Sequence, residues 1–146
     1  MKSKILNTNN DWVGFVIRLT IGLILFPHGA QKMLGIFGGY GFRGTMGFFT
    51  NTMHLPWIVS FLIIIIEFFG PLLLIVGFAS RLWSAAIIVL FIGIIFTSHL
   101  DHGFFMNWQG TQKGEGFEYA LIIIGISFAT LINGSGKYSV DHLITK

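Results

Sequence analysis

Four long apolar segments, separated by polar or glycine-rich stretches, dominate the hydrophobic pattern of the chain. They cover approximately residues 12–33, 56–78, 82–99 and 117–132. Within them, runs such as 63–66 are continuously apolar, whereas a transmembrane β-strand would alternate apolar and polar residues. A helix needs about 20 residues to cross the hydrocarbon core of a bilayer. The pattern therefore predicts an all-α protein, a four-helix transmembrane bundle forming a single domain over residues 1–146.

The ends of these segments carry residues typical of membrane-helix boundaries. Asp11 is placed to cap the first helix, and Pro56 suits the first position of the second. Tryptophan favours the headgroup layer, and all four tryptophans lie at or just outside predicted ends: Trp12, Trp57, Trp83 and Trp108. No small-residue cleavage site follows the first apolar segment, so we expect a retained helix and not a removed signal peptide.

The amino-acid composition also indicates a protein that is partly surrounded by lipid. Apolar residues make up 53% of the 146 and charged residues 10%, whereas a soluble domain carries about a quarter charged residues. Lys and Arg are scattered without a basic run, which argues against a nucleic-acid partner. The chain has no cysteine, which excludes disulfides, thiolate metal sites and a cysteine redox relay within it.

The distribution of basic residues predicts the orientation. An even number of spans places both termini on one side, and more Lys and Arg residues fall on that side than on the other. The terminal side holds Lys2, Lys4, Arg81, Lys137 and Lys146, against Lys32, Arg43 and Lys113. Because cytoplasmic loops are enriched in positive charge, we expect cytoplasmic termini, with the loops 35–55 and 100–116 facing outward.

The first outward loop combines glycine with aromatic residues. Six glycines lie among Phe37, Tyr40, Phe42, Phe48 and Phe49. We expect an irregular loop folded over the mouth of the bundle, because such backbone at membrane depth requires shielding by protein or a cavity. Residues 39–44 match G-x-G-x-x-G, but they follow a membrane helix and not a strand. We therefore expect no nicotinamide or flavin site in this chain.

Two charged residues lie deep inside predicted spans, away from the span ends. Arg18 is about two turns into the first, and Glu67 is near the middle of the second. An unpaired charge at such depth costs several kcal/mol, so we expect the two to pair across antiparallel helices. Pro71 removes the helical donor to the Glu67 carbonyl, which would make a polar pocket there. A structural salt bridge and a role in transport or redox chemistry both remain open.

A second polar cluster is expected at the outward end of the bundle. It comprises His28, Lys32, His99, Asp101, His102 and Glu118. Histidine titrates near neutral pH, so these residues suit a proton site or a site for a quinone headgroup. His99, His102 and Glu118 are also weak candidates for a metal site. A polar cap that closes the bundle end is the structural alternative.

Ordered motifs along nearly the whole chain resemble the DoxX family of membrane proteins. They comprise Arg18 with Gly22, the run 28–33, Glu67 to Gly70, Gly77 with Arg81, Glu118 to Leu121, and the segment 134–141. The resemblance implies a four-span protein of the bacterial inner membrane, associated with oxidoreductases and related to the DoxD subunit of thiosulfate:quinone oxidoreductase. Pro71 departs from the family, which often has glycine there.

The resemblance favours a subunit of a membrane oxidoreductase system that meets a quinone. The polar head of the quinone would lie near His28, Lys32, His99 and Glu118. Glu67 and Arg18 would lie deeper on a polar path from the same cavity. The rings of Phe37, Tyr40 and Phe42 would stack on the apolar part of the ligand. A small-molecule or proton transporter that uses Glu67 is the second reading. One four-span chain has little room for alternating access, so a transporter would need a homo-oligomer. A non-catalytic scaffold for a redox partner is the third reading.

Overall fold

The computed structural model describes residues 5–146, and within that range the chain is all-α without a β-strand. The α-helices are α1 (Trp12–Leu34), α2 (Gly41–Gly47), α3 (Trp57–Val76), α4 (Ser80–Ile94), α5 (Glu118–Asn133) and α6 (Val140–Thr145). A π-helical turn, Phe48–Thr52, follows α2. A π-helical turn and a 3₁₀ turn, Ile95–His99 and Leu100–His102, extend α4.

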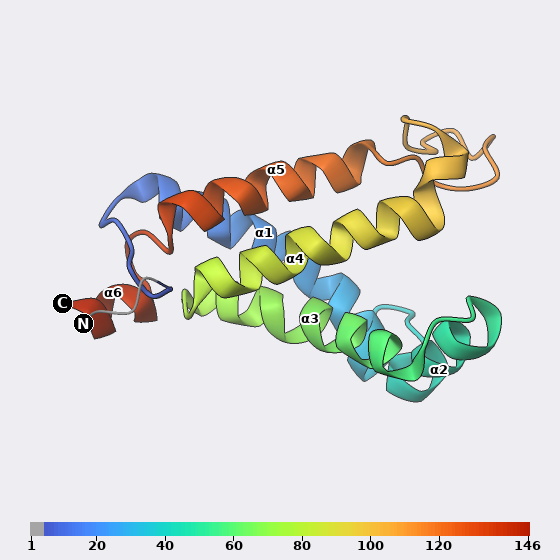
Figure 1. The fold of residues 1–146 in the computed structure, drawn as a ribbon, viewed down its shortest axis with the longest axis horizontal. Helices are drawn as coiled ribbons and strands as arrows, with labels where there is room; N and C mark the ends of the chain where they lie inside the picture. Colours follow the sequence, from blue (N-terminus) through green and yellow to red (C-terminus); the bar gives the residue numbers. More distant parts are fainter. Residues whose placement is uncertain (1–4) are drawn as a thin grey trace.

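The four longer helices lie side by side (Figure 1). α1 packs against α3 and α5, and α4 packs against the same two helices. Helix α6 and the segment that precedes α1 lie at one end of the molecule, and the connections around α2 and between α4 and α5 lie at the other. We call these the terminal end and the loop end.

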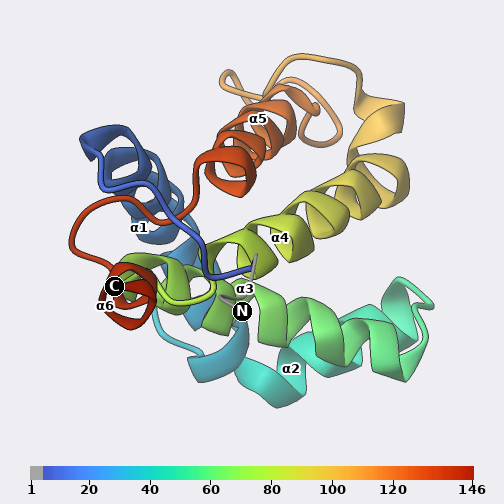
Figure 2. The same ribbon diagram turned by 60° about the vertical axis from the view of Figure 1, so that its left-hand side comes forward.

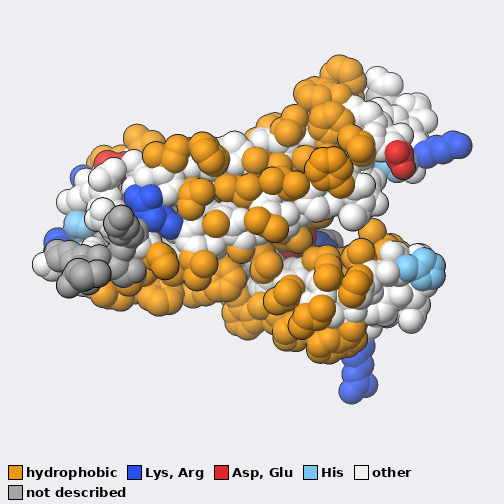
Figure 3. Space-filling view, in the orientation of Figure 1, with side chains coloured by type: hydrophobic (Ala, Val, Ile, Leu, Met, Phe, Trp, Pro, Cys, Tyr) orange, Lys and Arg blue, Asp and Glu red, His pale blue; other side chains and the backbone are white. Residues whose placement is uncertain are grey.

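Within residues 5–146, three helical segments are long and apolar enough to cross a membrane: Trp12–Leu34, Trp57–Val76 and Ser80–His102. Helix α5 is also apolar but has 16 residues, or about 24 Å at 1.5 Å per residue. A bilayer core is about 30 Å thick. Figure 3 shows hydrophobic side chains spread along the flanks of the long helices, which suits contact with lipid.

Local sequence explains the helix ends. The Asp11 carboxylate caps α1 by accepting a hydrogen bond from the Gly14 N–H at 2.8 Å, as predicted. Helix α3 begins at Trp57, one residue later than predicted, because Pro56 keeps an extended conformation as its N-cap. It ends at Val76, and Gly77 follows as the C-cap with a φ of 71°, the left-handed conformation that glycine adopts without strain.

The expectation of an irregular loop over residues 35–55 is wrong. Much of this stretch forms α2 and the π-turn after it, which lie beside α1 and α3 at the loop end (Figure 2). Met46 and Phe49 are buried against Ile64 of α3. Burial of an apolar face stabilises a helix more than intrinsic propensity does, and here it outweighs the glycines.

Glycines fix the register between α1 and α3. A Cβ on Gly29 would overlap the carbonyl oxygen of Glu67, and one on Gly22 would lie 3.0 Å from the carbonyl oxygen of Pro71. The two helices therefore approach backbone to backbone. The carbonyl that Pro71 leaves without a helical donor is covered by Gly29 and does not open a polar pocket.

Candidate functional site

Lys32 of α1 and Glu67 of α3 form an ion pair between Nζ and Oε2. The Glu67 side chain is 7% exposed and that of Lys32 is 29% exposed. Side chains on a helix lean toward its N-terminus. Lys32 therefore reaches back to the level of Gly29, where Glu67 lies. The pair is a buried carboxylate neutralised by a cation that retains access to the surface.

The predicted pair of Arg18 with Glu67 is wrong. The register places Glu67 beside Gly29, which is eleven residues beyond Arg18. At 1.5 Å per residue the two levels are about 16 Å apart along α1, beyond the reach of the two side chains. Arg18 instead lies near the end of α3, where the last turn leaves carbonyl groups without helical partners.

Each N–H of the Arg18 guanidinium donates to a backbone carbonyl, and the side chain is fully buried. Two bonds go to Leu74 and Ile75 at the end of α3, at 2.8 and 2.6 Å. Three go to the segment before α6: Ser135 at 2.6 Å, Lys137 at 3.1 Å and Tyr138 at 2.8 Å. Guanidinium has five N–H donors, so none remains for a ligand. We infer that Arg18 is a structural clamp.

Asp141 supports the same end of the molecule and was not a candidate from the sequence. It is 1% exposed, and its carboxylate accepts hydrogen bonds from the N–H groups of Ala79 and Ser80 at 2.8 and 3.1 Å, and from the Ser135 hydroxyl. Its negative charge also attracts Arg18. Asp141 lies in the segment 134–141, one of the motifs that resemble the DoxX family. It is outside the predicted apolar spans, so the sequence did not indicate that it is buried.

Two further polar side chains lie near the Lys32–Glu67 pair. His28 is exposed one helical turn before Lys32 and is within electrostatic range of both charges. Tyr119 of α5, which the sequence analysis did not select, is within electrostatic range of Glu67. Its hydroxyl is buried and has no hydrogen-bond partner in residues 5–146. A buried hydroxyl is costly to leave unpaired, so this atom suits a bound water or ligand.

A pocket of about 250 Å³ opens beside Lys32 at the loop end. It is lined by Gln31, Lys32, Gly38, Gly39, Tyr40, Thr45, Phe48 and Phe49. Of the aromatic residues expected to stack on a ligand, Tyr40 lines the pocket. Phe42 instead packs edge-to-face against Phe61, and Phe37 is 63% exposed. Phe48 and Phe49 complete the aromatic lining.

His99 and Glu118 bond within the connection between α4 and α5. His99 Nδ1 lies 3.0 Å from the carbonyl oxygen of Gly116. Glu118 accepts hydrogen bonds from the Met106 N–H at 3.1 Å and from the Trp108 indole at 3.3 Å. Neither side chain bonds to the Lys32–Glu67 pair. Figure 3 shows a hollow between this connection and the α2 region, with acidic and basic atoms at its inner end.

The metal site considered for His99, His102 and Glu118 is not formed. Across residues 5–146, no group of three His, Asp or Glu side chains is arranged to hold a metal ion. The hydrogen bonds of His99 and Glu118 explain why, since each is directed at the local backbone or at Trp108.

An all-α fold with three helices able to cross a bilayer, and an ion pair buried between two of them, defines the class as a helical membrane protein. The sequence model of the DoxX family matches residues 14–100, and the chain belongs to that family. It is 29% identical over 131 residues to "Putative oxidoreductase CatD" of Bacillus subtilis (strain 168), across 90% of this chain and 86% of that protein. No solved structure matches the chain.

Proposed function

We propose that this protein is a component of a membrane oxidoreductase system and binds a quinone, or a similar amphipathic ligand, beside Lys32. The observation that carries the proposal is the buried Lys32–Glu67 pair, whose cation also lines an aromatic pocket. Apolar pockets with a few convergent polar groups are typical ligand sites. The oxidoreductase name of the Bacillus subtilis relative supports the same class.

The pocket offers a quinone both an apolar surface for its ring and a hydrogen-bond donor for a carbonyl oxygen. Tyr40, Phe48 and Phe49 offer apolar surface to the ring. The Lys32 ammonium can donate a hydrogen bond to a quinone carbonyl oxygen and offset the negative charge that develops there on reduction. Quinone reduction consumes protons as well as electrons, and in this proposal Glu67 exchanges a proton with Lys32, its direct partner.

In this proposal His28, His99 and Glu118 lie farther from the ligand than the Lys32–Glu67 pair. His28 lies at the exposed edge of the pair, where it can pass protons toward water. His99 and Glu118 belong to the connection across the hollow, and we assign them to the proton path at its rim. Electrons would come from a redox partner protein, because this chain has no cysteine relay.

We further propose that α5 is the fourth membrane span, in a bacterial inner membrane, with cytoplasmic termini. Helix α5 packs against α1 and α4, and α6 lies at the same end of the molecule as the segment that precedes α1. The test fuses a topology reporter to each terminus and inserts one near Gly110. A cytoplasmic signal from the insertion at Gly110 would contradict the orientation.

The binding test titrates a short-chain quinone into the purified full chain in detergent and measures heat. We expect Lys32→Met to weaken binding about 10- to 100-fold, the usual value of a hydrogen bond to a charged group. Lys113→Met is the control, because Lys113 is exposed in the α4–α5 connection. Wild-type affinity in a folded Lys32→Met variant would contradict the site. Absence of binding by the wild type would contradict the function.

A further inference from the structure

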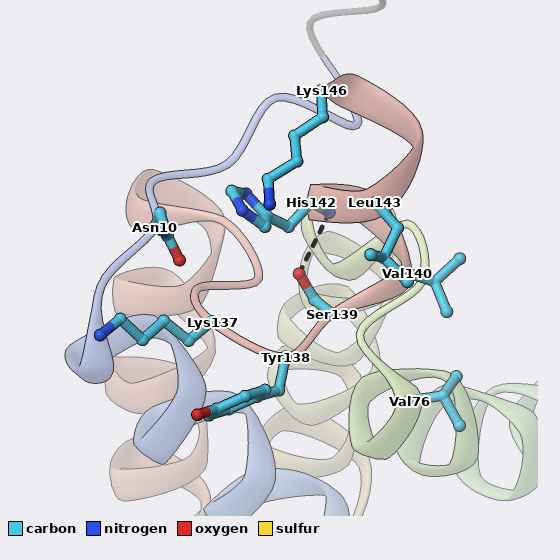
Figure 4. Close-up of a pocket in the computed structure, with 9 residues that line it drawn as sticks. All are labelled: Asn10, Val76, Lys137, Tyr138, Ser139, Val140, His142, Leu143 and Lys146. Carbon is cyan, nitrogen blue, oxygen red and sulfur yellow. Dashed lines mark hydrogen bonds between the residues drawn. The ribbon is translucent and has the colours of Figure 1, made fainter.

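A second pocket, of about 550 Å³, lies at the terminal end, at the opposite end of the molecule from Lys32. It is lined by Asn10, Val76, Lys137, Tyr138, Ser139, Val140, His142, Leu143 and Lys146 (Figure 4). These residues come from the segment before α1, from the end of α3, from the segment that follows α5, and from α6. The proposed redox site uses none of them.

The lining is divided by polarity. In Figure 4, His142 and Lys146 lie next to one another, and Lys137 comes from the segment before them, with Asn10 on the same side. Val76, Val140 and Leu143 lie on the other side. No acidic side chain is among the described residues of the lining. The nearby carboxylate of Asp141 is directed at the start of α4, where it binds Ala79 and Ser80. The pocket thus pairs a cationic wall with an apolar one.

The surroundings place this pocket at the depth of lipid headgroups. Val76 is the last residue of a helix able to span a membrane. The rings of Trp12, Phe15 and Tyr138 pack edge-to-face, and Lys137 Nζ lies 4.8 Å from the Trp12 ring centre. Exposed Trp and Tyr with neighbouring Lys are typical of the membrane–water interface.

Helix α6 buries Asp141 and exposes apolar side chains. The Asp141 side chain is 1% exposed, whereas those of Leu143 and Ile144 are 72% and 58% exposed. A helix with exposed apolar residues and basic neighbours suits the plane of the membrane interface. Helix α6 is held there by the contacts of Asp141 and of the segment bound to Arg18.

We propose that this pocket binds the phosphate headgroup of an anionic phospholipid. His142 and Lys146, which lie next to one another, meet the phosphate. Lys137, whose ammonium lies over the Trp12 ring, adds positive charge at the edge of the pocket, and the acyl chains lie along Val76, Val140 and Leu143. A free phosphate would satisfy the cationic wall alone, whereas a lipid also covers the exposed apolar wall. Basic pockets beside membrane helices bind anionic headgroups on the same principle.

Native mass spectrometry of the full chain in neutral detergent tests this proposal. The probes are dioleoyl-phosphatidylglycerol, dioleoyl-phosphatidylcholine and inorganic phosphate. We expect the anionic lipid to bind more tightly than the zwitterionic one. The double variant Lys137→Gln/Lys146→Gln should weaken its binding about 30-fold, from about fivefold for each basic residue near an anionic surface.

Arg43→Gln/Lys113→Gln is the matched control, because it removes the same charge from exposed positions in α2 and in the α4–α5 connection, at the loop end. It should retain wild-type affinity. Equal affinity for the two lipids, or equal weakening in both double variants, would overturn the proposal. Phosphate that binds in a lysine-dependent manner and is not displaced by the anionic lipid would assign the pocket to a soluble anion instead. Thermal melting of each variant confirms that it folds.

Discussion

Gly29 of α1 lies directly against the backbone carbonyl of Glu67 in α3. This approach sets the register of the two helices and brings Glu67 within reach of Lys32. A side chain at position 29 would separate the helices and with them the two charges. The close contact is therefore a condition for the candidate site as well as for packing.

Gly29→Ala should destabilise the protein. Overpacking a tight contact costs about 1–3 kcal/mol or more, and here the obstacle is backbone, which cannot rotate away. The measurement is the free energy of unfolding in detergent. Gly125→Ala is the control, since a Cβ there meets nothing within 4 Å. It should be neutral, or stabilising by about 0.5–1 kcal/mol through helix propensity. Equal stability of the two variants would contradict the register.

The Lys32–Glu67 pair should show an asymmetric response to substitution. Lys32→Met leaves an unpaired carboxylate that is 7% exposed, and breaking a buried pair costs about 3–5 kcal/mol. Glu67→Gln should cost less, because the 29% exposed Lys32 can turn toward water. The double variant Lys32→Met/Glu67→Gln should cost less than the sum. A double-mutant cycle of unfolding free energies measures this coupling, and additive costs would show that the two side chains do not interact.

Arg18→Lys should loosen the C-terminal segment even though it keeps the charge. An ammonium group has three donors around a single atom and cannot span carbonyls as separate as those of Leu74, Ser135 and Tyr138. We expect lower thermal stability and faster tryptic cleavage after Lys137. Arg43→Lys, at an exposed position, should change neither. Unchanged cleavage in Arg18→Lys would show that Arg18 does not hold this segment.

The cap of α1 predicts a pH dependence. Burial raises the pKa of Asp11, but hydrogen bonds from the Gly14 N–H and the Asn133 side chain outweigh it and hold the pKa below its ordinary value. A folded-state pKa below the unfolded one, about 3.9, adds stability that is present above about pH 4 and is lost as the pH falls through the folded value.

Asp11→Asn tests this dependence, because asparagine still caps the helix but does not titrate. The wild type should be the more stable protein above about pH 4. Its advantage should shrink as the pH is lowered further, measured as the difference in unfolding free energy at each pH. An advantage that grows on acidification would contradict the assignment.

The linear sequence was sufficient to predict the long helices and much of their limits. The apolar segment 12–33 became α1, Trp12–Leu34, with Asp11 as its cap, and the segment 117–132 became α5, Glu118–Asn133. A helix satisfies its hydrogen bonds within one continuous segment. Its existence and ends therefore depend on neighbouring residues, which a sequence shows directly.

Only the tertiary structure decided which charge neutralises Glu67 and which residues close the terminal end. Arg18 was the predicted partner, but the glycine contacts place Glu67 within reach of Lys32, which the sequence had not paired with it. The burial of Asp141 likewise depends on the start of α4, some sixty residues earlier in the chain. Helix α2 formed despite its glycines because Met46 and Phe49 found an apolar surface on α3. Each outcome depends on the relative placement of whole helices, which close contacts between distant residues determine and local periodicity does not encode.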